Sequence, residues 1–161
     1  MPVIVTDSGF GADDWTGGFT PGADLAANGP VVAVDLAPGA DPDPLRGRLD
    51  EIAIIRVDFP SFADGRGFTI ARRLRLMGYA GRLRAKGHLI ADQYAMARRS
   101  GFDEVEISND LAARQPQDQW LARADWQAHD YQSRLRGDAR GFPGPGRRLE
   151  EGADRLVRVT Q

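Results

Sequence analysis

The feature that most constrains the fold is a regular alternation of short β-branched segments with amphipathic segments in the middle of the chain. Ile52–Asp58 is almost continuously hydrophobic, which is typical of a strand covered on both faces in a parallel sheet. A helical period follows it, with Ile70, Ala71 and Leu74 on one face and a natural stop at Gly78. Such short connections predict parallel strands that are joined by right-handed crossovers.

The same patterns predict further elements on both sides of this unit. We expect strands at 31–36, 82–86 and 105–107, helices at about 44–51 and 89–100, a helix capped by Ser108 or Asn109, and another that begins at Pro116. Together they indicate a single α/β domain of successive βα units with a mainly parallel sheet. Periodicity does not distinguish an open layered sheet from an incomplete barrel, so both architectures stay open.

The two ends of the chain differ from this centre. Residues 1–30 are rich in Gly and Asp and predict a peripheral segment with a strand or hairpin at Val3–Thr6. Residues 136–161 are rich in Gly, Pro and Arg and predict a flexible extension, with a possible short strand at 156–159. The expected organisation is therefore an α/β domain at 1–135 followed by that extension.

Composition excludes several classes of chemistry. The chain has no cysteine, which excludes disulfides, thiolate metal sites and thiol catalysis. No motif for flavin, nicotinamide, haem or sirohaem is visible, so any cofactor is unknown. Neither histidine has two further strong ligands beside it, so we expect no metal centre. The N-terminus lacks the pattern of a signal peptide, and no apolar run approaches the roughly 20 residues of a membrane span, so we expect a cytoplasmic protein that does not contact membranes.

Charge is distributed unevenly along the chain. Residues 1–64 contain 11 acidic and 3 basic residues, whereas 65–99 contain 9 basic residues and a single acidic one, Asp92. The basic segment could attract a small anion or an acidic partner surface, or the acidic N-terminal part could fold against it and neutralise it. Nucleic acid is not an expected partner, because the isoelectric point is near 5.7 and no aromatic residues alternate with the arginines.

Charged residues gather toward the ends of the predicted strands. These residues are Asp35, Asp58, Arg84, Lys86 and Glu106. In parallel α/β sheets the carboxyl ends of the strands form the edge where ligands bind, so Asp58 and Arg84 are expected to approach each other or a shared pocket. A buried network of ion pairs would produce the same pattern, and the sequence leaves both interpretations open.

A tight turn with several ionisable groups lies between a strand and a helix. In Gly65–Phe68, backbone N–H groups at the start of the helix could face an anion, with Arg66 adding charge. The alternative is that Asp64 caps the helix while Arg66 pairs with Asp58. The turn lacks the Lys-Ser/Thr of a Walker loop and the three glycines of a dinucleotide fingerprint.

Two residues near the third strand are further candidates. His88 follows that strand and could act as an acid or a base. Asp92, beside Gln93 in the first turn of the next helix, favours the positive end of that helix, where capping is its expected use.

The combined spacing resembles a bacterial family of unknown function that is commonly described as an oxidoreductase probably involved in sulfite reduction and that is associated with sulfate-assimilation genes. The resemblance covers about residues 31–132 and rests on Asp64-Gly65-Arg66-Gly67-Phe68, Ala71-Arg72, Leu74-Arg75, Gly78-Tyr79, Gly81, Leu83-Arg84-Ala85, Gly87, Asp92-Gln93 and Gly101-Phe102-Asp103. No catalytic residue is established for the family, so the resemblance implies a pathway rather than a reaction.

Two functions follow from this resemblance. The first is an accessory protein of assimilatory sulfite reduction, with sulfite reductase or another sulfate-assimilation protein as its partner. The second is a small oxidoreductase or anion-binding enzyme that acts on sulfite or a phosphorylated metabolite. The candidate anion- or partner-binding residues are Asp58, Asp64, Arg66, Arg72, Arg84, Asp92 and Gln93.

Overall fold

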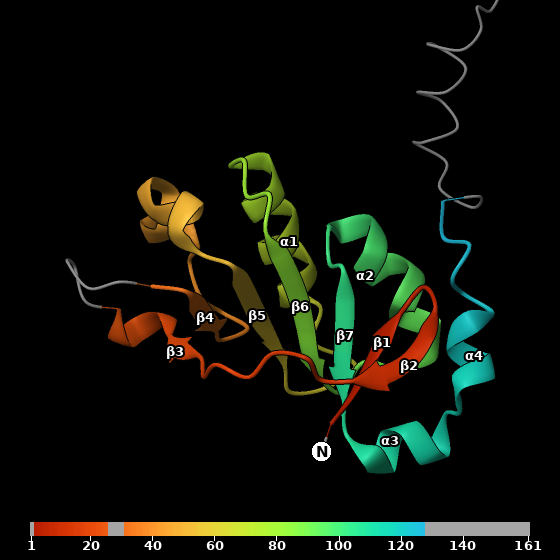
Figure 1. Ribbon diagram of the computed structural model, residues 1–161. Coiled ribbons are helices and arrows are strands. Elements are labelled where there is room, and N and C mark those ends of the chain that lie inside the picture. The colour runs from red at the N-terminus through yellow and green to blue at the C-terminus, as the bar shows by residue number, and fades with distance from the viewer. Residues whose placement is uncertain (1, 26–30, 128–161) are drawn as a thin grey trace, which may run out of the picture. The chain divides into compact units, whose positions relative to one another are not determined.

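The computed structural model describes residues 2–25 and 31–127, whose strands form one seven-stranded mixed sheet (Figure 1). The strand order is β2-β1-β7-β6-β5-β4-β3. Strands β3 to β7 are parallel, and β1 is antiparallel to both β2 and β7. The strands are β1 (Val3–Thr6), β2 (Gly9–Ala12), β3 (Thr20–Pro21), β4 (Ala33–Leu36), β5 (Ile54–Phe59), β6 (Arg82–Gly87) and β7 (Glu104–Ile107).

Helices and 3-10 turns connect these strands. They are η1 (Gly22–Asp24), η2 (Asp43–Glu51), α1 (Arg66–Leu76), η3 (Ala91–Gln93), α2 (Tyr94–Ser100), α3 (Asn109–Arg114) and α4 (Gln117–Leu121). The predicted cap of α3 is confirmed, since the Ser108 hydroxyl accepts a hydrogen bond from Leu111 N. The element predicted at 44–51 is a 3-10 helix, and η3 precedes α2. Among the described residues, no helix has both the length and the apolar character that crossing a membrane requires.

The prediction of a single α/β domain with a mainly parallel sheet is confirmed for the described residues, and the sheet is open rather than an incomplete barrel. Its two edge strands have few free backbone groups with which another strand could pair. Strand β3 contains only two residues, one of them Pro21, and Phe10 N of β2 donates to Gln117 Oε1.

The hairpin expected at Val3–Thr6 is present, because β1 pairs antiparallel with β2, and it forms one edge of the sheet. Strand β1 lies inside the sheet between β2 and β7, because Ile4 and Val5 are buried and pair with the otherwise open edge of β7. The predicted extension at 136–161 and the strand at 156–159 lie outside the described residues.

The sheet has one apolar and one charged face. Consecutive parallel strands advance in one direction, so right-handed crossovers place their helices on the same side. Side chains at 55, 57, 83, 85 and 105 point to that side and are fully buried against α1 and α2. The alternate positions point to the other face, which the segment between β2 and β3 crosses (Figure 1).

We expect Gly67→Ala to destabilise the protein by about 1 to 3 kcal/mol, because a Cβ atom at this position in α1 would collide with the buried Phe59 ring. Gly65→Ala, in the same turn, is the matched control, since a Cβ atom there would meet only the Phe68 side chain, at an ordinary contact distance of 3.7 Å. Urea unfolding of both variants measures the difference. Equal stability of the two would contradict the close packing of α1 on β5.

Candidate functional site

Ion pairs connect four parallel strands across the charged face of the sheet. Arg84 is completely buried, and its guanidinium donates from Nε to Glu104 at 2.7 Å and from Nη1 to Glu106 at 2.9 Å. Arg56 bridges Asp35, at 2.6 Å from Nε, and Glu106, at 3.1 Å from Nη1. Arg84 therefore neutralises two carboxylates that are themselves buried, which makes this network part of the folded framework.

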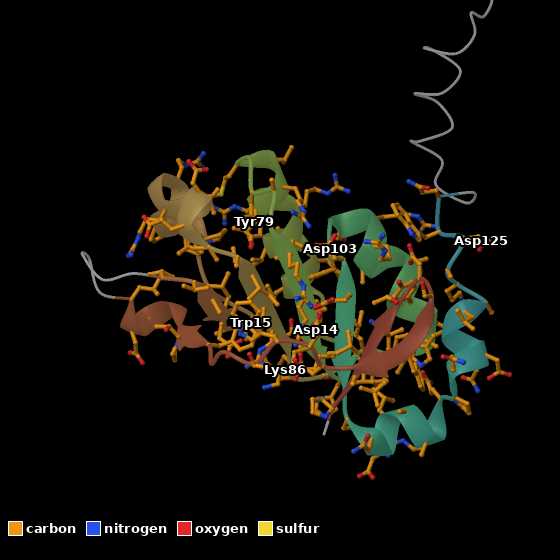
Figure 2. The ribbon with its side chains drawn as sticks, in the orientation of Figure 1. Asp14, Trp15, Tyr79, Lys86, Asp103 and Asp125 are labelled. Atoms are coloured by element: carbon orange, nitrogen blue, oxygen red, sulfur yellow. The ribbon has the colours of Figure 1, made fainter. Side chains whose placement is uncertain are left out.

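The segment 13–19 covers the network and adds opposite charge to it. Asp13 lies 3.1 Å from Nη2 of Arg84, and Asp14 lies 2.9 Å from Nη2 of Arg82. Figure 2 shows Asp14 on the same side of the sheet as the neighbouring Trp15. The N-terminal acidic part thus neutralises part of the basic segment, as one of the two interpretations of the charge pattern predicted.

Two further observations describe the surroundings of these arginines. The Phe19 ring lies over the Arg56 guanidinium, with 3.8 Å between the guanidinium carbon and the ring centroid. Burial lowers the pKa of Arg84, but the neighbouring carboxylates outweigh that penalty and raise it above its ordinary value. Arg84 stays charged and has no exposed surface for a ligand.

The predicted approach of Asp58 and Arg84 is not observed. They lie on neighbouring strands and the same face, but Asp58 is opposite Lys86, whereas Arg84 is in the middle of β6 opposite Arg56. No ion pair between Asp58 and Arg84 is found in the described part of the chain. Arg84 is the third of six residues in β6, whose carboxyl end is Gly87, so it lies inside the sheet rather than at the edge.

The turn before α1 contains its own ion pair. Arg66 pairs with Asp64 at 2.7 Å rather than with Asp58, because Asp64 is only two residues away and its Oδ1 also accepts Arg66 N at 3.1 Å. The N-cap position is Gly65, so Asp64 does not occupy it. Hydrogen bonds from the Arg66 side chain and backbone lower the pKa of Asp64 to about 2.

The other three candidates have different surroundings. Arg72 is exposed on α1 and has no hydrogen bond or ion pair to another described residue. Asp92 pairs with Arg123 instead of capping its helix. Gln93 accepts a hydrogen bond from Ile90 N at 3.0 Å and donates to Phe62 O at 2.7 Å, so it connects the loops after β5 and β6.

Arg75, which was not a predicted site residue, organises the amino ends of β6 and β7. Its guanidinium donates to the carbonyl oxygens of Tyr79, Gly81 and Gly101 and to the Asp103 carboxylate, at 2.8 to 3.0 Å. Asp103 also accepts Leu83 N at 2.9 Å. These residues also carry part of the family resemblance. That part of the sequence pattern therefore builds a structural junction, which we call the Arg75 junction. Tyr79 and Asp103 lie at the end of the sheet away from Lys86 (Figure 2).

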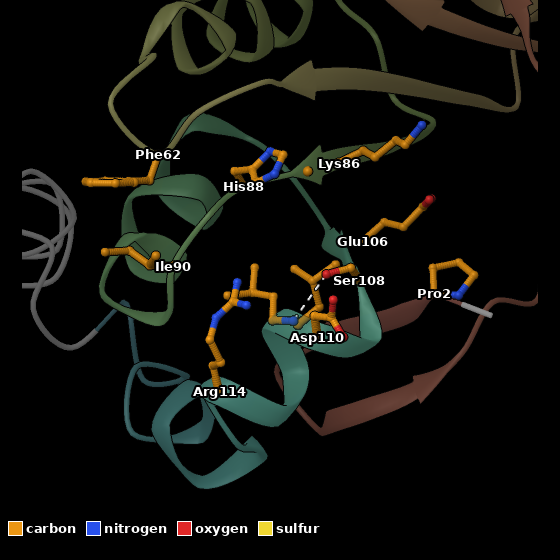
Figure 3. A pocket seen from close by; sticks show the side chains of 12 residues that line it. Pro2, Phe62, Lys86, His88, Ile90, Glu106, Ser108, Asp110 and Arg114 are labelled. Carbon is orange, nitrogen blue, oxygen red and sulfur yellow. Dashed lines mark hydrogen bonds between the residues drawn. The ribbon is translucent and has the colours of Figure 1, made fainter.

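A pocket of about 550 Å³ lies at the opposite end, beyond the carboxyl ends of β6 and β7 (Figure 3). This is the edge at which parallel α/β sheets commonly bind ligands. The pocket is lined by Pro2, Phe62, Lys86, Gly87, His88, Ile90, Glu106, Ile107, Ser108, Asp110, Leu111 and Arg114. Of the charged residues at the strand ends, Lys86 and Glu106 line this pocket. None of the seven candidate site residues lines it.

Most charged side chains around this pocket are unpaired within the described residues, unlike those of the ion-pair network. Glu106 is already paired with Arg56 and Arg84. The side chains of Lys86, Asp110 and Arg114 have no hydrogen bond or ion pair to any residue in the described ranges. His88 is exposed, with Nδ1 3.4 Å from Phe59 O. The candidate functional site is therefore this pocket, whose exposed polar side chains are His88, Ser108, Asp110 and Arg114.

Sequence reasoning missed Arg56, Glu104 and Arg114. The first two had a usable signal, because charges at every second position of adjacent strands face one another across a sheet. For Arg114 the only signal was its place one helical turn after Asp110, behind the end of a strand. Within the described residues, no group of three or more His, Asp or Glu side chains could hold a metal ion.

Comparison with known proteins identifies one family. The model of a family described as "Bacterial protein of unknown function (DUF934)" matches residues 33–142, which is more than half of the chain. No curated protein and no solved structure showed significant similarity.

Replacing Arg84 tests whether it serves stability. We expect Arg84→Gln to cost about 3 kcal/mol, the lower end of the range for breaking a buried ion pair, because the buried Glu104 and Glu106 would keep only Arg82 and Arg56 as cationic partners. Arg72→Gln removes the same charge from an exposed site and should change stability by less than about 0.5 kcal/mol. Chemical unfolding of the two variants gives the comparison. An unaltered midpoint for Arg84→Gln would contradict a structural role.

Acid should weaken the attachment of the segment 13–19. Burial raises the pKa of Asp13, but hydrogen bonds from Arg84 and Trp15 N outweigh it, so the folded-state pKa lies below the ordinary 3.8. The resulting stabilisation is present above pH 3.8 and is lost as the pH falls below that value. Asp13→Asn can still accept from Trp15 N but lacks the charge.

Melting temperatures of wild type and Asp13→Asn between pH 7 and pH 2 test this expectation. The variant should melt lower at pH 7 and converge with the wild type in acid. Parallel curves over the whole range would show that the Asp13 charge does not hold the segment.

Proposed function

Since the chain belongs to the DUF934 family of bacterial proteins of unknown function, we propose that it is an accessory protein of assimilatory sulfite reduction that supports sulfite reductase. The pathway comes from the resemblance to proteins described as probably involved in sulfite reduction. The accessory role comes from the way this chain uses the residues that carry the resemblance.

The observation that favours an accessory role is the Arg75 junction. Arg75, Gly81, Gly101 and Asp103 hold two strands and a helix together and do not line the candidate pocket. Arg84 is likewise enclosed by carboxylates. A shared pattern that maintains a framework is expected for a protein whose outer surface contacts a partner.

Helix α1 offers a surface for such a contact. Arg72 and Leu76 are four residues apart and so lie on the same side of this helix. Leu76 is 79% exposed, and Arg72 is exposed without an ion pair to another described residue. An apolar side chain beside an unpaired cation suits a partner surface that is apolar at its centre and acidic at its rim.

The alternative, an anion-binding enzyme, is favoured by a different observation. The pocket beyond β6 and β7 combines His88 and Arg114 with an apolar wall, which is a common arrangement for small-molecule sites. Turnover of sulfite or of a phosphorylated metabolite by the isolated protein would favour this alternative. Co-purification with sulfite reductase would favour the accessory role.

Growth of a deletion strain tests the pathway. Loss of the gene should impair growth on sulfate or sulfite as the sole sulfur source, and cysteine should restore it, because cysteine is formed after sulfite is reduced. Complementation with the double variant Arg72→Glu, Leu76→Ser should fail if α1 contacts the partner. It should also reduce recovery of sulfite reductase in a pull-down by about tenfold or more.

Arg46→Glu reverses a charge on an exposed 3-10 helix and serves as the matched control, with growth and pull-down as in the wild type. Normal growth and sulfite consumption of the deletion strain, in a genome without a second copy, would remove the pathway assignment. Full complementation by the double variant would instead remove only the α1 surface.

A further inference from the structure

The pocket beyond the carboxyl ends of β6 and β7 has the size and wall of an organic-ligand site. Its volume of about 550 Å³ falls within the range of about 300 to 1,000 Å³ that is usual for small-molecule pockets. Phe62, Ile90, Ile107 and Leu111 supply an apolar wall. An inorganic anion alone would leave that wall exposed to water, so the wall suits a ligand with an apolar body.

One part of this wall is held in place by a hydrogen bond from another loop. Phe62 is 59% exposed, and Gln93 Nε2 donates to its carbonyl oxygen at 2.7 Å. Gln93 also accepts from Ile90 N, so the loops that carry Phe62 and Ile90 are tied together. Gln93 is thus a positioning residue for the pocket, which gives this predicted candidate a role through its neighbours.

The charge that faces the pocket comes from Arg114. Figure 3 shows its side chain extending from α3 toward the side where His88 lies, while Lys86 and Glu106 extend away from it. Asp110 is one turn earlier on α3, but no ion pair joins it to Arg114, and its carboxylate lies nearer Ser108 (Figure 3). Among the described residues, then, the Arg114 guanidinium has free donors directed at an apolar cavity.

We propose that this pocket binds a small organic carboxylate whose apolar body packs against Phe62, Ile90 and Leu111 and whose carboxylate accepts hydrogen bonds from the Arg114 guanidinium. The planar guanidinium can donate two parallel hydrogen bonds to a carboxylate, which fixes both the position and the orientation of the ligand. His88 lies on the opposite wall and contacts the ligand body. This site is separate from the α1 surface and does not depend on the proposed function.

Isothermal titration of the full chain with matched probes tests the proposal. 4-Methylpentanoate should bind with a dissociation constant on the order of 1 mM, as expected for so small a ligand. 4-Methylpentanamide has the same shape without the charge, and acetate has the charge without the apolar body. Each should bind at least about tenfold more weakly, because each lacks one of the two recognised features.

Two variants locate the binding site. Arg114→Gln should raise the dissociation constant of 4-methylpentanoate by about tenfold or more, and Phe62→Ala should weaken it less, by about threefold to tenfold. Arg46→Gln removes another exposed arginine, from η2 and outside the pocket, and should leave binding unchanged. Both pocket side chains are exposed, so circular dichroism should confirm that the variants stay folded.

Three results would overturn the proposal. They are no saturable binding of the acid below about 20 mM, equal binding of the acid and its amide, and unchanged binding by a folded Arg114→Gln variant. Stronger binding of sulfite or phosphate than of 4-methylpentanoate would also reject the carboxylate and would favour the anion-binding enzyme.

Discussion

The structure depends on a guanidinium inside a β-sheet. Arg84 has no exposed surface, and its charge is tolerated because Glu104 and Glu106, on the next strand, accept its hydrogen bonds. Arg56 repeats the arrangement one strand away with Asp35. On this face β6 contributes cations and β7 contributes carboxylates at alternate positions, and a shift of one residue in register would place them against the apolar helices. The network specifies which residues face each other.

Arg75 is the second side chain that organises the fold, and the number and arrangement of its hydrogen-bond donors matter more than its charge. Its donors bind three carbonyl oxygens and one carboxylate, and these acceptors come from the turn after α1 and from the turn before β7. A Cβ atom at Gly101 would meet the Arg75 side chain at 2.6 Å, so the absence of a side chain there makes room for the guanidinium. Lysine could not replace this arginine, since one ammonium group cannot reach four acceptors in a plane.

The sequence was sufficient to predict the sheet, the crossovers and most helix ends, because hydrophobic periodicity reports which side of an element is buried. Three features escaped it. The role of Arg84 could not be decided, because charged residues at alternate positions fit an exposed edge and a buried network equally well. The attachment of Asp13 joins residues 71 positions apart in the chain. The pocket depends on Phe62 from a loop, Arg114 from α3 and residues of other elements, whose convergence only the fold determines.

The two edges of the sheet determine how another protein can approach. At one edge Gln117 occupies the backbone N–H of Phe10, and at the other a two-residue strand ends in a proline that has no N–H to donate. Within the described residues, these features disfavour the addition of an incoming peptide to this sheet as an eighth strand. The described edges of the sheet therefore favour recognition through side chains, whose specificity can change through surface substitutions while the backbone of the sheet stays the same.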